Sequence, residues 1–107
     1  MTLVYELRHY VPNEGKAEAL AERFQKLVFP LIEKHGLKLK DYWVSADGSG
    51  EIWYVMAWES EDAIKKGWDL FRDDHKWTEG KAASEVDGVL VASSRSIVLR
   101  QPAYYRG

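Results

Sequence analysis

The sequence predicts an α+β fold, and two observations support it. Segments with the two-residue period of strands and the 3.6-residue period of helices follow one another in the order strand, helix, strand, strand, helix, strand. No linker, internal repeat or low-complexity stretch divides the 107 residues, so we expect one domain over residues 1–107. This order is that of the ferredoxin-like βαββαβ fold, in which both helices cover one face of a four-stranded antiparallel sheet.

The first strand is predicted over residues 2–10, where successive side chains alternate between two faces. The two sets are Leu3, Tyr5, Leu7 and His9 on one face, and Val4, Glu6, Arg8 and Tyr10 on the other. The first set is typical of an ordinary core. The second set places a carboxylate, a guanidinium and a phenol in a row, and this row is the main candidate for a functional surface.

A helix is predicted from about residue 15 to residue 35, after a turn that contains Pro12 and Asn13. Its apolar residues recur in steps of three and four and form one stripe, which consists of Leu20, Phe24, Leu27, Val28, Leu31 and Ile32. Pro30 lies inside this pattern, so we expect a kink or a break near Val28. Gly36 is typical of a helix C-terminus.

A β-hairpin is predicted next, because the Asp-Gly-Ser-Gly run at 47–50 separates two strand-like segments. The first of these segments covers residues 37–47. The second covers residues 51–58 and is apolar on both faces. This pattern is typical of a central strand that is covered on both sides.

A second helical region is predicted to begin after Ser60, which is a good N-cap residue. Its apolar stripe consists of Ile64, Trp68 and Phe71. We expect an interruption at residues 72–74 and a short further helix over residues 75–85. The last strand is predicted over residues 89–100, and the tail after it carries Tyr104 and Tyr105.

The predicted elements point to self-association. Two helices can cover only one face of the sheet, yet the third strand is apolar on both faces. A soluble monomer rarely exposes a contiguous apolar area of this size. We therefore predict a homodimer in which the sheets pack face to face and enclose the face of Glu6, Arg8 and Tyr10.

Composition excludes several classes of function. The formal net charge is −2 and no basic block occurs, so no nucleic-acid partner is expected. The lack of cysteine excludes disulfides and thiolate chemistry, and three histidines without a spacing motif predict no metal site. No apolar run approaches the ~20 residues of a membrane span and no leader is recognised, so we expect a cytoplasmic protein.

Short motifs along the chain resemble those of the NIPSNAP family. Residues 5–10, Tyr-Glu-Leu-Arg-His-Tyr, resemble the opening motif of that family. Further segments with similar motifs lie at 13–16, 30–36, 42–43, 57–60, 74–77 and 95–100. The resemblance implies a dimeric α+β barrel, in which two ferredoxin-like units pack their sheets together. It also implies a protein of unassigned activity that binds a small organic molecule in a pocket between sheet and helices.

Residues on several elements are candidates for the site. We take Glu6, Arg8 and His75 as candidates for catalysis: Arg8 would receive a carboxylate or enolate oxygen, and Glu6 or His75 would act as base. The residues expected to contact a small aromatic or carboxylate ligand are Arg8, Tyr10, Tyr54, Trp58 and Arg95. The alternatives are a plain ion pair between Glu6 and Arg8, and a His75 that is solvated at a helix start.

Two further functions stay open beside small-molecule binding. Residues 58–63, followed by His75, resemble a segment of the antibiotic-biosynthesis monooxygenases. That resemblance implies a monooxygenase or isomerase that acts on an aromatic or enolisable substrate without metal, flavin or any other cofactor. The other function is a non-catalytic interaction module that uses Tyr104 and Tyr105.

Overall fold

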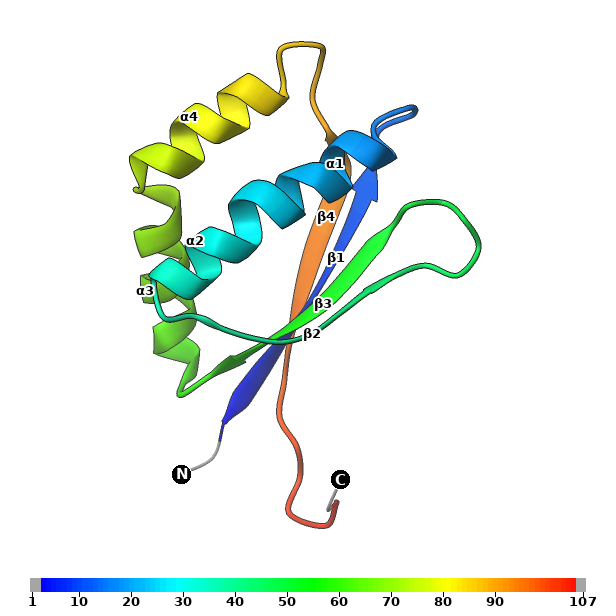
Figure 1. Ribbon diagram of the computed structural model, residues 1–107. Coiled ribbons are helices and arrows are strands. Elements are labelled where there is room, and N and C mark those ends of the chain that lie inside the picture. The colour runs from blue at the N-terminus through cyan, green and yellow to red at the C-terminus, as the bar shows by residue number, and fades with distance from the viewer. Residues whose placement is uncertain (1–2, 106–107) are drawn as a thin grey trace.

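A four-stranded antiparallel sheet carries the helices on one of its faces (Figure 1). The computed structural model describes residues 3–105. Along the chain its elements are β1 (Val4–Pro12), α1 (Ala17–Arg23), the π-helical segment η1 (Phe24–Val28), α2 (Phe29–Lys34), β2 (Lys38–Val44), β3 (Ile52–Trp58), α3 (Glu61–Arg72), α4 (His75–Ser84) and β4 (Val91–Leu99). The strands lie in the order β2-β3-β1-β4. The predicted ferredoxin-like α+β fold is thereby confirmed.

The helices pack on the face of the sheet that carries the polar row of β1. Val4 and Glu6 are buried there, with 5% and 2% of their surface exposed, whereas Leu3 on the opposite face is 39% exposed. Two expectations are therefore wrong: the set with Leu3 does not form the core, and the polar row does not face a second sheet. Alternation along a strand separates two faces but does not tell which one the helices cover.

β3 is an inner strand of the sheet, as the sequence predicts, but the helices cover only one of its two sides. Its buried side chains on the helix side are Ile52, Tyr54, Met56 and Trp58, and its half-buried side chains on the other side are Trp53, Val55 and Ala57. β1 pairs with β3 in an antiparallel register that sets Arg8 opposite Tyr54. Directly opposed residues point to the same face of a sheet, so these two side chains meet under the helices.

The first helical region breaks where Pro30 predicts it. α1 and α2 are joined by η1, in which the Phe29 N–H donates to the Phe24 carbonyl, five residues back. Proline has no N–H to give to the carbonyl four residues earlier, and its ring crowds that carbonyl. The π-helical turn accommodates both effects without ending the helix.

The second helical region divides at residues 73 and 74. The Ser60 side chain caps α3, and the Asp74 side chain caps α4 by accepting from the Lys76 N–H. α3 also packs close to β3 at Gly67, where a Cβ would overlap the ring of Trp58. The predicted interruption is confirmed, and the second cap shows that α4 starts as a new helix with its own direction.

Strand ends differ from prediction, and β2 contains an irregularity. β2 and β4 are shorter than the predicted 37–47 and 89–100, and the predicted start of β1 at Thr2 lies outside the described residues. A register shift between Leu39 and Asp41 changes the alternation in β2. Leu39 consequently faces the helices whereas Trp43 lies opposite Trp53 on the other face. No helix within residues 3–105 is long and apolar enough to cross a membrane.

Candidate functional site

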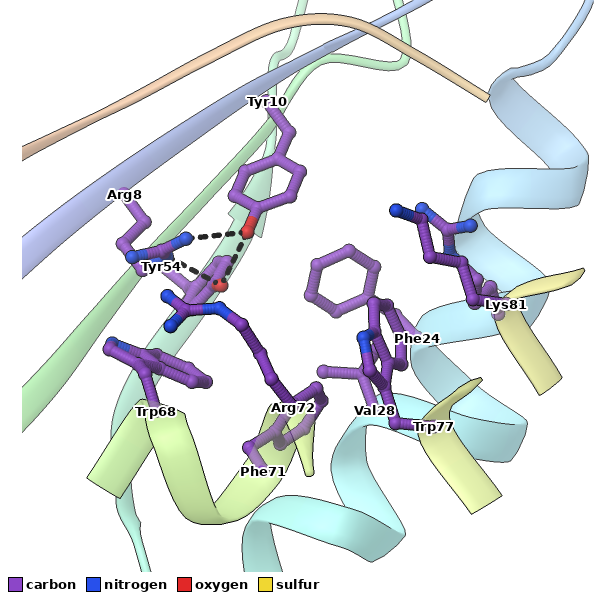
Figure 2. Close-up of a pocket in the computed structure, with 11 residues that line it drawn as sticks. Arg8, Tyr10, Phe24, Val28, Tyr54, Trp68, Phe71, Arg72, Trp77 and Lys81 are labelled. Atoms are coloured by element: carbon purple, nitrogen blue, oxygen red, sulfur yellow. Dashed lines mark hydrogen bonds between the residues drawn. The ribbon is translucent and has the colours of Figure 1, made fainter. Parts of the chain in front are cut away.

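A cavity of about 160 Å³ lies between the sheet and the helices (Figure 2). Most of its lining side chains are either cationic or aromatic. The cationic ones are Arg8, Arg23, Arg72 and Lys81, and the aromatic ones are Tyr10, Phe24, Tyr54, Trp68, Phe71 and Trp77. They come from β1, β3 and the helical segments, so the cavity depends on the complete fold.

Arg8 is held by three hydrogen bonds at the sheet end of the cavity. Its Nε donates to the Tyr54 hydroxyl at 2.9 Å, its Nη2 to the Tyr10 hydroxyl at 2.8 Å, and its Nη1 to Glu6 Oε2 at 2.7 Å. The Trp68 ring lies 4.7 Å from the guanidinium carbon, within the range of a cation–π contact. The guanidinium is thus fixed in orientation by the protein itself.

The arginine at this position stays charged, and the neighbouring phenol stays neutral. Burial lowers the pKa of Arg8, but Tyr54, Tyr10 and Glu6 raise it to a net value above the ordinary one. Burial raises the pKa of Tyr54 well above its ordinary value. The cavity therefore presents a cation and phenolic O–H groups at neutral pH.

The two phenols leave one proton without a protein acceptor. Each hydroxyl oxygen accepts from Arg8, and the Tyr54 and Tyr10 oxygens lie 3.3 Å apart, so one of them donates to the other. The second hydroxyl proton donates to no group within the described chain. A phenol has only one proton to give, and this one is available to an oxygen atom in the cavity.

Glu6 lies behind Arg8 rather than in the cavity wall. Its Oε1 accepts from the indole N–H groups of Trp58 at 3.2 Å and Trp68 at 2.8 Å, while its Oε2 accepts from Arg8. The side chain is 3% exposed. With a charged donor and two indoles around it, the buried carboxylate is satisfied and fixes the position of Arg8.

Arg23 is the second buried cation of the cavity. Its side chain is 5% exposed, and its Nη1 donates to Ser84 Oγ and Glu85 Oε2, each at 3.1 Å. The Trp77 ring lies 5.4 Å from the guanidinium carbon. Its buried Nε has no hydrogen-bond partner among the residues described. An orphaned N–H this deep in a protein is rare and unfavourable.

The structure brings together some of the predicted site residues and separates others. Arg8, Tyr10 and Tyr54 meet in the cavity wall. Trp58 is buried beneath it and contacts Glu6, so the expectation that it lines the pocket is wrong. The sequence pattern did not single out Arg23, Arg72 or Lys81. The sequence does contain a signal that Arg23 faces inward, since it lies three residues after Leu20 and four before Leu27, on the apolar stripe of the helix.

Arg95 and His75 lie away from this cavity. Arg95 is exposed and pairs with His9 across β1 and β4, which places it on the opposite face of the sheet from Arg8. His75 is exposed at the first position of α4 and does not line the cavity. Neither shares a pocket with Arg8, contrary to the expectation for Arg95. For His75 the solvated alternative is the correct one. No group of three or more metal-ligating side chains occurs in residues 3–105.

Comparisons with known proteins identify relatives of the fold. The family model of NIPSNAP matches residues 5–104. A NIPSNAP domain protein of Burkholderia xenovorans, described as uncharacterized, superposes with a TM-score of 0.78 at 16% identity, covering 97% of this chain and 99% of that one. A NIPSNAP family protein of unknown function from Agrobacterium tumefaciens gives 0.80 at 19% identity, with 97% and 92% covered.

A further structural neighbour carries an enzymatic description. A proposed monooxygenase from Lactobacillus acidophilus superposes with a TM-score of 0.68 at 15% identity, covering 92% of this chain and 44% of that chain. At such identities the likeness concerns the fold alone. No curated protein matches the sequence.

Proposed function

The chain belongs to the NIPSNAP family, and we propose that it binds a small organic acid in the cavity between its sheet and its helices. The observation that carries this proposal is the arrangement of Arg8, Tyr10 and Tyr54. Together they offer unused guanidinium N–H groups and a spare phenolic proton at one end of a cavity with aromatic walls. A carboxylate has the oxygen acceptors and the charge that complement these donors.

The cavity limits the ligand to a small molecule. Its volume of about 160 Å³ is close to the roughly 150 Å³ of an engineered cavity that admits benzene. A compound with one aromatic ring or a short carbon chain fills such a space. Larger ligands need to extend past the rim, where Arg72 is exposed.

Direct titration tests the proposal. We would titrate the protein with benzoate and, as a neutral analogue of similar size, with benzyl alcohol, and follow binding by calorimetry and tryptophan fluorescence. Benzoate should bind saturably and benzyl alcohol weakly, and Arg8→Gln should weaken benzoate binding about tenfold or more, since hydrogen bonds to charged groups contribute ~1.5–3 kcal/mol. Lys66→Gln removes one exposed positive charge from α3 and serves as the control. Failure of both benzoate and butanoate to bind contradicts the proposal.

A monooxygenase or isomerase acting on an enolisable substrate is the second candidate. Arg8 and the spare phenolic proton would stabilise an enolate oxygen, and the Lactobacillus acidophilus neighbour shares the fold. Against this reading, the described lining of the cavity includes no histidine, aspartate or glutamate to accept the substrate proton. Glu6 could serve only after giving up its bonds to Arg8 and Trp68. Binding is therefore the better-supported function.

We also propose that the protein is a homodimer that uses the uncovered face of the sheet. Large apolar side chains are exposed there: Trp43 at 49%, Ile97 at 43% and Leu99 at 47%. An open hollow of about 440 Å³ lies on the same face, and Tyr5, Trp43, Val55 and Leu99 are among the residues that line it. A second copy laid against this face would cover the apolar area and form the dimeric barrel that the family resemblance implies.

Two further predictions complete the proposed function. Tyr104 is 91% exposed and Tyr105 is 55% exposed, which is compatible with a tail that contacts another protein. A cytoplasmic location stays a prediction and is compatible with the lack of cysteine.

A further inference from the structure

We infer that the ligand of this cavity carries two acidic groups on opposite ends of a flat apolar spacer. The inference rests on the proposed binding function and specifies the class of ligand. It follows from a second cationic end, which is formed by Arg23 and Lys81 and lies apart from the Arg8 end, and from the aromatic walls between the two ends.

Arg23 has donors that the protein does not use. One guanidinium nitrogen, Nη1, donates to both Ser84 and Glu85, whereas the Nε is buried without a partner and Nη2 donates to no group within residues 3–105. A buried guanidinium is ordinarily surrounded by acceptors. Arg23 lines the cavity, and its Nη2, unlike the enclosed Nε, is not among the buried unpaired atoms. An acidic group bound beside it would therefore accept from Nη2.

Fixed carboxylates do not neutralise all the positive charge of the cavity. Glu6 offsets Arg8 and Glu85 offsets Arg23. Lys81 has no ion-pair partner within the described residues. The guanidinium of Arg72 lies 3.4 Å from Asp69, which is also bound by a lysine of its own helix at 2.7 Å. A ligand with two negative charges complements this excess better than a ligand with one.

The excess cations lie at different ends of the cavity. In Figure 2 the Arg72 side chain reaches toward the side where Tyr54 and Trp68 lie, whereas Lys81 lies on the side of Trp77. Phe24 occupies the middle of this view, between Tyr10 and Trp77. The two acidic groups of the ligand are therefore placed apart, one near Arg8 and Arg72 and the other near Arg23 and Lys81.

The walls between the two ends select the spacer. Phe24 packs edge-on against Tyr10 and Tyr54, with ring centroids 5.7 and 5.5 Å apart, and Phe71 packs against Trp77 at 5.0 Å. Aromatic surfaces of this kind favour a flat apolar group. The volume of about 160 Å³ admits one ring or a chain of a few carbons, with the two acidic groups at the ends.

The experiment compares ligands that differ by one acidic group. We would measure the affinities of benzoate and of the 1,3- and 1,4-benzenedicarboxylates at one ionic strength, by calorimetry. The better-fitting dicarboxylate should bind at least about tenfold more tightly than benzoate, as expected for one more charge-assisted interaction. In Arg23→Gln this ratio should fall toward one. Lys81→Gln, at an exposed position, should lower it several-fold and covers the case in which Arg23→Gln does not fold.

The outcomes separate this inference from the proposed function. If benzoate binds but neither dicarboxylate binds more tightly, or if the ratio is unchanged in both variants, the second acidic group is refuted and carboxylate binding stands. If benzoate, butanoate and both dicarboxylates all fail to bind, the proposed function fails and this inference fails with it. Lys66→Gln is the charge-matched control and should leave the ratio unchanged.

Discussion

The Nη1 of Arg8 lies 2.7 Å from Oε2 of Glu6 on the same face of β1, and the carboxylate is 3% exposed. Glu6 has no other positively charged partner among the described residues, since its remaining bonds come from the neutral indoles of Trp58 and Trp68. The charge of Glu6 under the helices therefore depends on Arg8.

Replacing Arg8 with alanine should destabilise the fold by about 3 kcal/mol, because it leaves a buried carboxylate without its counter-charge. Urea denaturation measures the change in the free energy of unfolding. Lys66→Ala, at an exposed position on α3, is the control and should stay within ~0.5 kcal/mol of the parent. An Arg8→Ala protein as stable as the Lys66→Ala control would show that Glu6 does not need this partner.

The pairing of Glu6 with Arg8 could be predicted from the sequence, because side chains along a strand alternate with a period of two residues and residues 6 and 8 therefore share one face. The enclosure of that face was also predicted, but its cover was not: the helices cover it instead of a second sheet, and the indole donors to Glu6 lie 52 and 62 residues away along the chain. Local alternation carries no information on such contacts. For the same reason the central strand β3 and the break at Pro30 were predictable, since hydrophobic period and proline geometry are local properties.

Arg95 and His75 show two other limits of prediction from the sequence. The alternation of side chains along β4 places Arg95 on one of the two faces of the sheet. Only the hydrogen-bonded register, which sets Arg95 opposite His9, tells which face this is. For His75 the stripe of α3 does not continue into α4, because Asp74 caps a new helix. The helical period is lost at such a cap, so a sequence pattern on one side does not predict orientation on the other.

Alkaline pH should weaken the fold through Tyr42. Burial among aromatic side chains raises the pKa of Tyr42 from 10.0 to about 12, so the folded protein holds this proton more tightly than the unfolded chain. Stability from this group is complete below pH 10 and is lost as the pH rises toward 12. Thermal unfolding between pH 9 and 12 should show a smaller decline in Tyr42→Phe than in the parent. Tyr104→Phe, at a 91% exposed position, should decline like the parent, and equal curves for all three proteins would refute the assignment.

Disrupting the uncovered sheet face should produce monomers. Val55 lies in the middle of β3 on that face, so Val55→Glu would place a charge inside the proposed interface, where burial is unfavourable. Sedimentation at micromolar concentration should show a dimer for the parent and a 12.3 kDa monomer for the variant. Ala82→Glu, at an exposed position of α4, should leave the mass unchanged. A parent protein that sediments as a stable monomer would contradict the homodimer itself.

Asp74 should make the junction between α2 and α4 sensitive to acid. Its Oδ2 accepts from Lys34 Nζ at 2.7 Å and from His35 Nε2 at 2.8 Å, and its Oδ1 accepts from the Lys76 N–H. These contacts, with the Lys34 hydrogen bond as the largest cause, hold the pKa of Asp74 below its ordinary value of 3.8. The stabilisation is therefore present above about pH 4 and is lost as the pH falls below that value.

Asp74→Asn isolates the charge, because asparagine caps a helix about as well as aspartate. The variant should be less stable than the parent at pH 7. The difference should shrink as the pH falls below 4, where Asp74 takes up a proton in the unfolded chain but not yet in the folded protein. Urea denaturation at pH 7, 5 and 3 measures the gap. Asp73→Asn is the control, since Asp73 is exposed and accepts no side-chain hydrogen bond within the described chain. A gap between parent and Asp74→Asn that stays constant with pH would mean that the lost stability comes from geometry and not from the charge of Asp74.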